Sequence, residues 1–114
     1  MNDILTHQPL REPTFYILLS LSPGPKHGYA ILKDVETLSE GRVLLSTGTL
    51  YGAIKRLLDR EWIKRSADPE PETADRDRKA YALTEHGRRA LNAEVERLRK
   101  LLVVAQIRTA KETS

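Results

Sequence analysis

The sequence predicts a mainly α-helical domain with one small β-hairpin, followed by a longer C-terminal helix. Three segments repeat their apolar side chains with helical spacing, and two short alternating segments flank a polar stretch that contains two prolines. With 114 residues, the chain has the length of a single domain. It has no cysteine, which excludes a disulfide framework, a thiolate metal site and a cysteine nucleophile.

The first two helices are expected over residues 14–22 and 26–38. The first is a continuous apolar run between two proline-containing segments. In the second, apolar residues recur at spacings of three and predict one buried stripe. These residues are Tyr29, Leu32 and Val35. Gly41 is expected to end this helix.

The third helix is expected over residues 47–60, with Ser46 as its N-cap. Its apolar residues follow the spacing i, i+4, i+7, i+8 and predict a buried face formed by Leu50, Ile54, Leu57 and Leu58. The other faces carry small, hydroxyl and basic side chains. Residues 55–65 and residues 85–114 each have a net charge of +3, so the basic excess lies on two segments, and the first of them includes the later part of this helix.

Two strands are expected over residues 62–67 and 79–83, with the polar segment 68–78 as the flexible tip of their hairpin. Three helices followed by a hairpin are the layout of a winged helix-turn-helix domain. In this fold the third helix lies in the major groove of DNA, and the hairpin forms the wing.

The last helix is expected to begin after Thr84 and to run to about residue 108. Its cap lacks the full capping box because Gly87 occupies the third helical position. A heptad stripe along it predicts a homodimer interface formed by Leu91, Val95, Leu98, Leu102 and Ala105. The alternative is that the helix folds back onto its own domain, which we expect for Leu91 but not for the later residues. The predicted division is a DNA-binding domain over residues 1–84 and a dimerisation helix with its tail over residues 85–114.

Three motifs are specific enough to compare with known families. They are His27-Gly28-Tyr29, the string S-T-G-T-L-Y-G-A-I-K-R-L over residues 46–57, and R-K-A-Y-A-L-T-E-H-G-R over residues 78–88. Through them, the chain resembles the PadR family of bacterial winged-helix transcriptional regulators over about residues 10–105. One departure is Glu61, which replaces the glycine that usually ends the third helix and makes a left-handed cap less favourable.

The resemblance implies a homodimeric, sequence-specific repressor that binds a near-palindromic operator in double-stranded DNA and is released by a small aromatic or hydrophobic effector. The predicted DNA-binding residues are Ser46, Thr47, Thr49, Tyr51, Gly52, Lys55, Arg56, Arg76, Arg78 and Lys79. Lys55 and Arg56 can reach either guanine edges or phosphates. Tyr51 either binds a phosphate or packs, and the wing cations either approach DNA or belong to a solvated loop.

Other classes of function find little support in the sequence. The three histidines lack metal-ligand spacing, and we expect no cofactor and no metal. The sequence has no catalytic carboxylate pair in a motif, no nucleophile elbow and no phosphate-binding loop. We therefore expect that the protein is not an enzyme. The longest apolar run, residues 101–105, is too short to span a membrane, and we expect a cytoplasmic protein. The alternative function is a winged-helix protein-interaction module with weak or no DNA binding, which the acidic wing favours.

Overall fold

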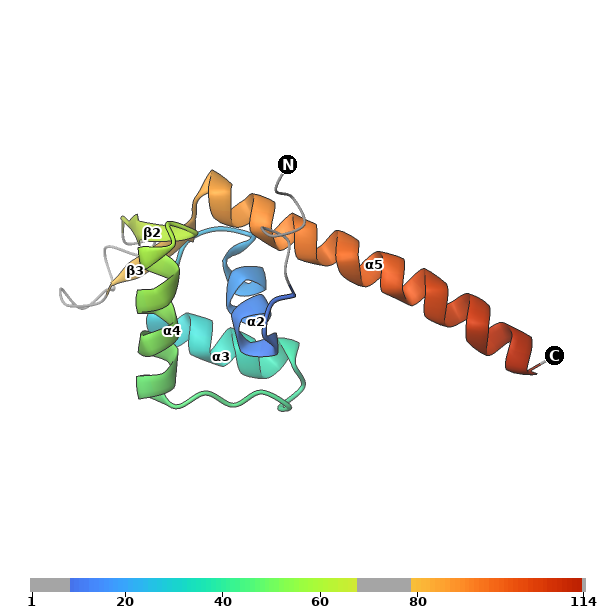
Figure 1. Ribbon diagram of the computed structural model, residues 1–114. Coiled ribbons are helices and arrows are strands. Elements are labelled where there is room, and N and C mark those ends of the chain that lie inside the picture. The colour runs from blue at the N-terminus through green and yellow to red at the C-terminus, as the bar shows by residue number, and fades with distance from the viewer. Residues whose placement is uncertain (1–8, 68–78, 114) are drawn as a thin grey trace.

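The computed structural model describes residues 9–67 and 79–113, which form a helical body from which one long helix projects (Figure 1). The elements in chain order are α2 (Glu12–Leu21), β1 (Lys26–His27), α3 (Gly28–Leu38), α4 (Thr47–Asp59), β2 (Ile63–Ser66), β3 (Ala80–Leu83) and α5 (Glu85–Thr113). The predicted mainly α-helical class and the winged-helix order of three helices, a hairpin and a last helix are confirmed. The last helix extends beyond the predicted end.

The wing strands belong to a three-stranded antiparallel sheet, not to the isolated hairpin that the sequence predicts. The strand order is β1-β3-β2. Lys26 of β1 pairs with Tyr81 of β3, and Ile63 of β2 pairs with Leu83. β1 has only two residues and leads directly into α3, so it is too short to show an alternating pattern in the sequence.

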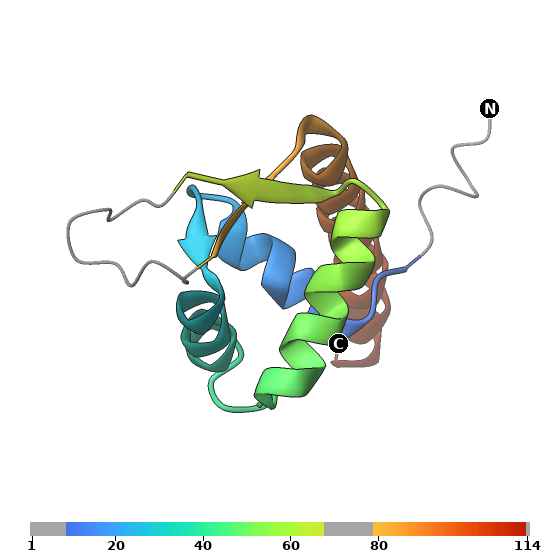
Figure 2. The ribbon, with the colours of Figure 1, turned by 90° about the vertical axis from the view of Figure 1, so that its left-hand side faces the viewer.

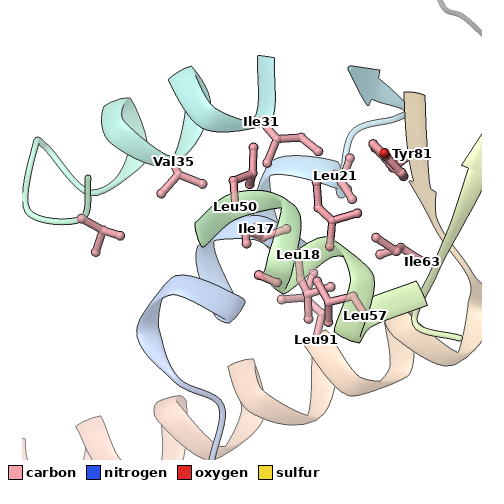
Figure 3. Packing of buried hydrophobic residues seen from close by; sticks show 13 residues of the cluster. Ile17, Leu18, Leu21, Ile31, Val35, Leu50, Leu57, Ile63, Tyr81 and Leu91 are labelled. Atoms are coloured by element: carbon pink, nitrogen blue, oxygen red, sulfur yellow. The ribbon is translucent and has the colours of Figure 1, made fainter. Parts of the chain in front are cut away.

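The core lies where α2, α3, α4 and the sheet meet the first turns of α5 (Figure 3). It is formed by Ile17, Leu18, Leu21, Ile31, Val35, Val43, Leu50, Ala53, Ile54, Leu57, Ile63, Tyr81 and Leu91. Burying a large aliphatic side chain contributes roughly 1.5–3 kcal/mol, so this cluster is the main source of stability. Leu50, Ile54 and Leu57 lie on the buried face of α4, as predicted.

Leu91 belongs to this core and not to an exposed seam. It is 3% exposed, and Figure 3 shows it pointing from α5 toward Leu18 and Leu57. The expectation that Leu91 packs against its own domain is therefore confirmed, and its place in the predicted dimer interface is corrected. Because Leu91 completes the body, the first turns of α5 are part of the packed domain.

The buried stripe of α3 differs from the prediction. Gly28, Ile31 and Val35 are the buried residues of this helix, while Leu32 is only half-buried. Tyr29, predicted to be in the core, is 65% exposed. The reason is that Gly28 faces α4, which sets the inner face of α3 at positions 28, 31 and 35 and rotates position 29 away from the core.

Ser39 organises the turn between α3 and α4. Its buried hydroxyl accepts a hydrogen bond from the backbone N–H of Val43 at 2.9 Å. Gly41, with φ of 80°, donates its N–H to the carbonyl of Glu36 at 2.9 Å. Gly41 thus follows the end of α3, as predicted, and residues 43–46 run without regular structure to the start of α4.

α4 ends in a left-handed cap although no glycine is present. Glu61 has φ of 62°, and the N–H groups of Glu61 and Trp62 donate to the carbonyls of Leu58 and Leu57 at 2.9 and 3.0 Å. This is the hydrogen-bond pattern of a Schellman motif. The Glu61 carbonyl accepts a 2.6 Å hydrogen bond from the hydroxyl of Thr84. The cap that the sequence makes less favourable is therefore formed, and a contact from a distant part of the chain supports it.

Thr84 also caps α5, as predicted. Its hydroxyl accepts a hydrogen bond from the Gly87 N–H at 2.9 Å, and its own N–H donates to the Trp62 carbonyl at 3.0 Å. A Cβ at position 87 would overlap the carbonyl oxygen of Trp62. The capping-box glutamate is absent because only glycine leaves room for this close approach.

Glu94 connects α5 to the segment that precedes α2. This buried carboxylate accepts hydrogen bonds from the Arg97 guanidinium at 2.9 and 2.7 Å. Hydrogen bonding by Arg97 and by the backbone of Leu10 lowers the pKa of Glu94, although burial acts in the opposite direction. The charged form is favoured at neutral pH, so the carboxylate holds the chain before α2 against α5.

Replacing Glu61 by glycine is expected to stabilise the protein. Glycine adopts positive φ without the steric cost of roughly 1–2 kcal/mol that other residues bear, and part of this gain is offset by its freedom in the unfolded chain. We expect Glu61→Gly to raise the free energy of unfolding by about 0.5–1 kcal/mol, measured by urea denaturation. Glu61→Gln is the control, because it removes the charge and retains the backbone strain. A Glu61→Gly variant no more stable than Glu61→Gln would contradict the assigned strain.

Candidate nucleic-acid interface

The start of α4 presents a group of exposed hydroxyl side chains. The Ser46 hydroxyl accepts a hydrogen bond from the Thr49 N–H at 3.1 Å, which confirms Ser46 as the N-cap. The same hydroxyl donates to the Thr49 hydroxyl oxygen at 2.9 Å. Ser46, Thr47 and Thr49 are all exposed. The first turn of α4 is therefore capped from within and keeps its polar groups toward solvent.

The basic residues of α4 follow further along the helix. Lys55 and Arg56 are exposed, and Gly52 is half-buried. Only the Arg56 guanidinium would come within 4 Å of a Cβ at position 52, at 3.8 Å. Gly52 therefore leaves the backbone of this face accessible, with long cations on the next turn. Figure 2 shows α4 on the near side of the body, with the sheet at its upper end.

Tyr51 connects α4 to the first turn of α3. Its side chain is 42% exposed, and its hydroxyl lies so close to Gly28 that a Cβ there would overlap it. Tyr51 therefore packs against α3, and the phosphate contact that the sequence also allows stays a prediction because part of the side chain is exposed. The contact also explains why a glycine precedes Tyr29: it allows α3 and α4 to approach each other closely.

The wing provides additional basic side chains. Lys79 is exposed directly before β3, while Arg76, Arg78 and the predicted flexible tip, residues 68–78, lie outside the described residues. Two exposed cations on β2, Lys64 and Arg65, were not among the predicted site residues. The charge excess of residues 55–65 includes them, but only the structure shows that Arg65 pairs with Tyr81 and that Lys64, which pairs with Ala82, lies on the other face of the sheet.

Arg65 and Tyr51 lie around the same buried tyrosine. Burial raises the pKa of Tyr81 on β3, the Arg65 guanidinium opposes this effect, and Tyr51 adds to it. An electrostatic effect of both residues on one hydroxyl requires that both lie near it. Arg65 pairs with Tyr81 across the sheet, so Arg65 of the wing and Tyr51 of α4 both lie near the Tyr81 hydroxyl.

The cations of this surface differ from three arginines of α5 in their partners. Three arginines of α5 form ion pairs within the helix, and the pairs are Arg89–Glu85, Arg97–Glu94 and Arg99–Glu96. No carboxylate within the described ranges lies within 4 Å of the basic groups on α4 and the wing strands, which are Lys55, Arg56, Lys64, Arg65 and Lys79. Their charge is available to a polyanion.

The later residues of the heptad stripe lie on the projecting part of α5 (Figure 1). Val95, Leu98 and Leu102 are 38–56% exposed, and Ala105 is exposed as well. Other exposed apolar residues, Val103, Val104 and Ile107, stand outside this stripe. A projecting helix with this much apolar surface has the character of an interaction surface.

The described part of the chain shows neither a metal site nor a membrane span. Within residues 9–67 and 79–113, no three potential ligands among His, Asp and Glu are grouped to hold a metal ion. Over the same residues, no helix combines the length and the apolar character needed to cross a bilayer.

Comparison with known families agrees with this geometry. The sequence model of the transcriptional regulator PadR-like family matches residues 17–93, more than half of the chain. The chain belongs to the PadR-like family of transcriptional regulators. The matched region contains α3, α4, the wing strands and the first turns of α5, which together form the PadR-like body.

Solved structures show the same PadR-like architecture. A PadR family transcription regulator from Clostridium difficile R20291 is 27% identical, with a TM-score of 0.70, and the match covers 84% of this chain and 96% of that one. Bacillus subtilis PadR in complex with operator DNA is 23% identical, with a TM-score of 0.61, and the match covers 72% of this chain and 45% of that one. The latter likeness shows the fold.

A curated relative extends the comparison to Streptomyces fradiae. It is an uncharacterized 37.1 kDa protein in transposon TN4556, 33% identical over 85 residues. The match covers 75% of this chain and 22% of that protein, so the PadR-like chain spans about a fifth of the length of this relative.

The contact between Tyr51 and Gly28 predicts a strong energetic coupling. Gly28→Ala is expected to lower the free energy of unfolding by about 1–2 kcal/mol, because overpacking exceeds the gain in helix propensity. In a Tyr51→Ala background the same substitution should be neutral or stabilising. Urea denaturation of the four proteins gives the coupling energy.

Gly48→Ala serves as the matched control for this cycle. A Cβ at position 48 has no atom within 4 Å, so its effect should be the same with and without Tyr51. If Gly28→Ala lowers the free energy of unfolding by the same amount with and without Tyr51, the packing role assigned to Tyr51 is incorrect.

Proposed function

We propose that this PadR-like chain is a homodimeric, sequence-specific DNA-binding repressor. The observation that carries the proposal is the group of cations on α4 and the wing strands that have no carboxylate partner among the described residues, next to an exposed, internally capped helix start. Lysine and arginine neutralise phosphates, and a helix of this kind fits the major groove. The solved Bacillus subtilis PadR holds operator DNA, and we propose the same class of ligand here.

The roles we assign on this surface follow from side-chain size and position. Ser46, Thr47 and Thr49 lie on the leading turn of α4, where short hydroxyl groups contact base edges or phosphates. Lys55 and Arg56, one to two turns later, bind phosphates or guanine edges. The wing is assigned to the neighbouring DNA phosphates, through Arg76, Arg78 and Lys79 together with Lys64 and Arg65 of β2. The place where α4 comes closest to the DNA phosphates is assigned to Tyr51 and Gly52.

We further propose that residues 85–114 form the dimerisation helix, whose first turns also complete the core of the DNA-binding domain over residues 1–84. Pairing two copies through Val95, Leu98, Leu102 and Ala105 would bury apolar surface that a monomer exposes. A two-fold dimer presents two α4 helices to the two halves of a near-palindromic operator. As the family resemblance implies, we propose that the protein represses transcription in the cytoplasm. A small aromatic or hydrophobic effector that binds near the dimer interface would release the protein from its operator.

The DNA-binding proposal predicts the behaviour of a double substitution. Lys55→Ala combined with Arg56→Ala should weaken binding to the DNA upstream of the chain's own gene by about tenfold or more. The slope of log affinity against log salt should also fall by about one per lost phosphate contact. Fluorescence anisotropy with a labelled duplex at several salt concentrations measures both quantities.

The control for this experiment removes the same charge elsewhere. Lys100→Ala with Arg108→Ala changes two exposed cations of α5 and should leave DNA affinity unchanged. Equal affinities for the Lys55/Arg56 variant and the unchanged protein would refute the interface. No binding by any of the proteins would favour a protein-interaction module instead.

The dimer proposal predicts different effects at two neighbouring apolar positions. Leu102→Glu places a charge in the proposed seam and is expected to yield a monomer in native mass spectrometry and light scattering. Val103→Glu, at a similarly exposed position outside the stripe, is expected to retain the dimer. A dimer that survives Leu102→Glu, or a monomeric unchanged protein, would rule out this seam.

A further inference from the structure

Two hydrogen-bonded paths connect the end of α4 to the start of α5, and both pass through Thr84. In one, the Thr84 hydroxyl donates to the Glu61 carbonyl at 2.6 Å and accepts from the Gly87 N–H at 2.9 Å. In the other, the Thr84 N–H donates to the Trp62 carbonyl at 3.0 Å. Glu61 and Trp62 are bound in turn to the last turn of α4 through their own N–H groups. In Figure 1 and Figure 2, α4 ends and α5 begins at the same end of the body.

Other polar contacts of α5 lead to the ends of α2. The Arg88 guanidinium donates to the carbonyl of Ser22, which follows α2, at 3.3 Å. The Glu94 carboxylate is hydrogen-bonded by the backbone of Leu10, which precedes α2. These contacts hold α5 against α2 but do not set its direction relative to α4.

Apolar packing also joins α5 to α4, because Leu91 points toward Leu57 in the core (Figure 3). The hydrophobic effect is non-directional, so this packing holds the two helices together without fixing the angle between them. A hydrogen bond weakens steeply when its angle departs from linearity. The direction of α5 relative to α4 therefore depends on the bonds of Thr84.

The length of α5 amplifies a change of direction at this point. At 1.5 Å per helical residue, the middle of the proposed seam lies about 24 Å from Thr84. A rotation of about 10° at Thr84 moves the seam by about 4 Å, which exceeds the step of about 3.4 Å between base pairs. A two-fold dimer combines the displacements of both copies, so a small rotation changes the separation of its two α4 helices by a base pair or more.

We propose that Thr84 is a positioning residue for operator recognition, whose hydroxyl fixes the direction of α5 relative to α4 and thereby the half-site spacing that the dimer accepts. The inference rests on the proposed function. Thr84 does not contact DNA in this proposal and acts through the Glu61 carbonyl. Its role as the cap of α5 needs only an acceptor, whereas the bond to Glu61 needs a donor. Substitutions at this position can therefore separate the two roles.

The decisive pair of variants is Thr84→Asp and Thr84→Ser. An ionised aspartate retains the acceptor that caps α5 but has no hydrogen to donate to the Glu61 carbonyl, and serine retains both functions. Each variant is combined with Asp59→Cys on α4 and Lys100→Cys on α5 for spin labelling. Both positions are exposed, and the chain has no cysteine of its own. Dilution with unlabelled protein restricts the measured distances to one chain.

Double electron–electron resonance should give one narrow distance distribution for the labelled protein with Thr84 and for Thr84→Ser. Thr84→Asp should give a broader distribution, or one displaced by about 4 Å. Ile17→Val is the control, because it destabilises the core without touching this connection and should retain the narrow distribution. Circular dichroism melting verifies the fold of each protein. Thr84→Val, which removes both bonds of the hydroxyl at constant shape, replaces Thr84→Asp if that variant does not fold.

The DNA readout uses the site that footprinting defines on the duplex upstream of the chain's own gene, with one or two base pairs inserted or removed at its centre. The unchanged protein, Thr84→Ser and Ile17→Val should bind these altered duplexes about tenfold or more weakly than the original. Thr84→Asp should distinguish the original from the altered duplexes by less than about threefold. A role limited to stability would lower the melting temperature and leave this discrimination in place.

The outcomes separate this inference from the proposed function. A monomeric unchanged protein, or one that does not bind DNA, would overturn both. If the unchanged protein discriminates between spacings and Thr84→Asp does so equally, only the positioning role of Thr84 is overturned. An unaltered distance distribution in Thr84→Asp would also overturn it, as would an equal loss of discrimination in Ile17→Val.

Discussion

The hydroxyl of Thr84 forms the connection on which the arrangement of the two functional helices depends. It donates to the Glu61 carbonyl just after α4 and accepts from the Gly87 N–H in the first turn of α5. The Trp62 carbonyl lies against Gly87 at the same point. The end of α4 and the start of α5 are thus joined at one side chain. In a dimer paired through α5, this joint sets the separation of the two α4 helices, which must match half-sites about 34–36 Å apart.

The distribution of charge has more meaning than its sum. A net charge of +3 is a weak argument for a polyanionic ligand. The structure shows that several arginines of α5 are neutralised within their own helix, while the cations on α4 and the wing strands have no carboxylate partners in the described ranges. Residues 85–114 also have a net charge of +3, so the position of the cations on α4 and the wing strands, and not the amount of charge, distinguishes this surface. These cations lie apart from the projecting part of α5 (Figure 1). This separation keeps the two proposed activities, DNA contact and pairing, on different surfaces.

The predictions from the sequence succeeded where one local pattern decided the outcome. The buried face of α4, its cap at Ser46 and the cap of α5 at Thr84 were predicted correctly, because spacing and capping act within a few residues. The predictions were wrong where contacts with a segment distant in sequence determined which side chains are buried or which lie together. Tyr29 was assigned to the core because spacing alone does not show that Gly28 meets Tyr51. Lys64 and Arg65 were absent from the predicted site because charge counting does not place a strand beside a helix.

By itself, the sequence determined the class of fold, the order of its elements, the family motifs and the apolar stripe along the last helix. These properties follow from periodicity and residue type, which are local in the chain. Only the tertiary structure decided that β1 joins the sheet, that Tyr29 lies outside the core and that Glu61 can end α4 without a glycine. Each of these depends on contacts between segments far apart in sequence, and such contacts select one conformation among several that local preferences allow.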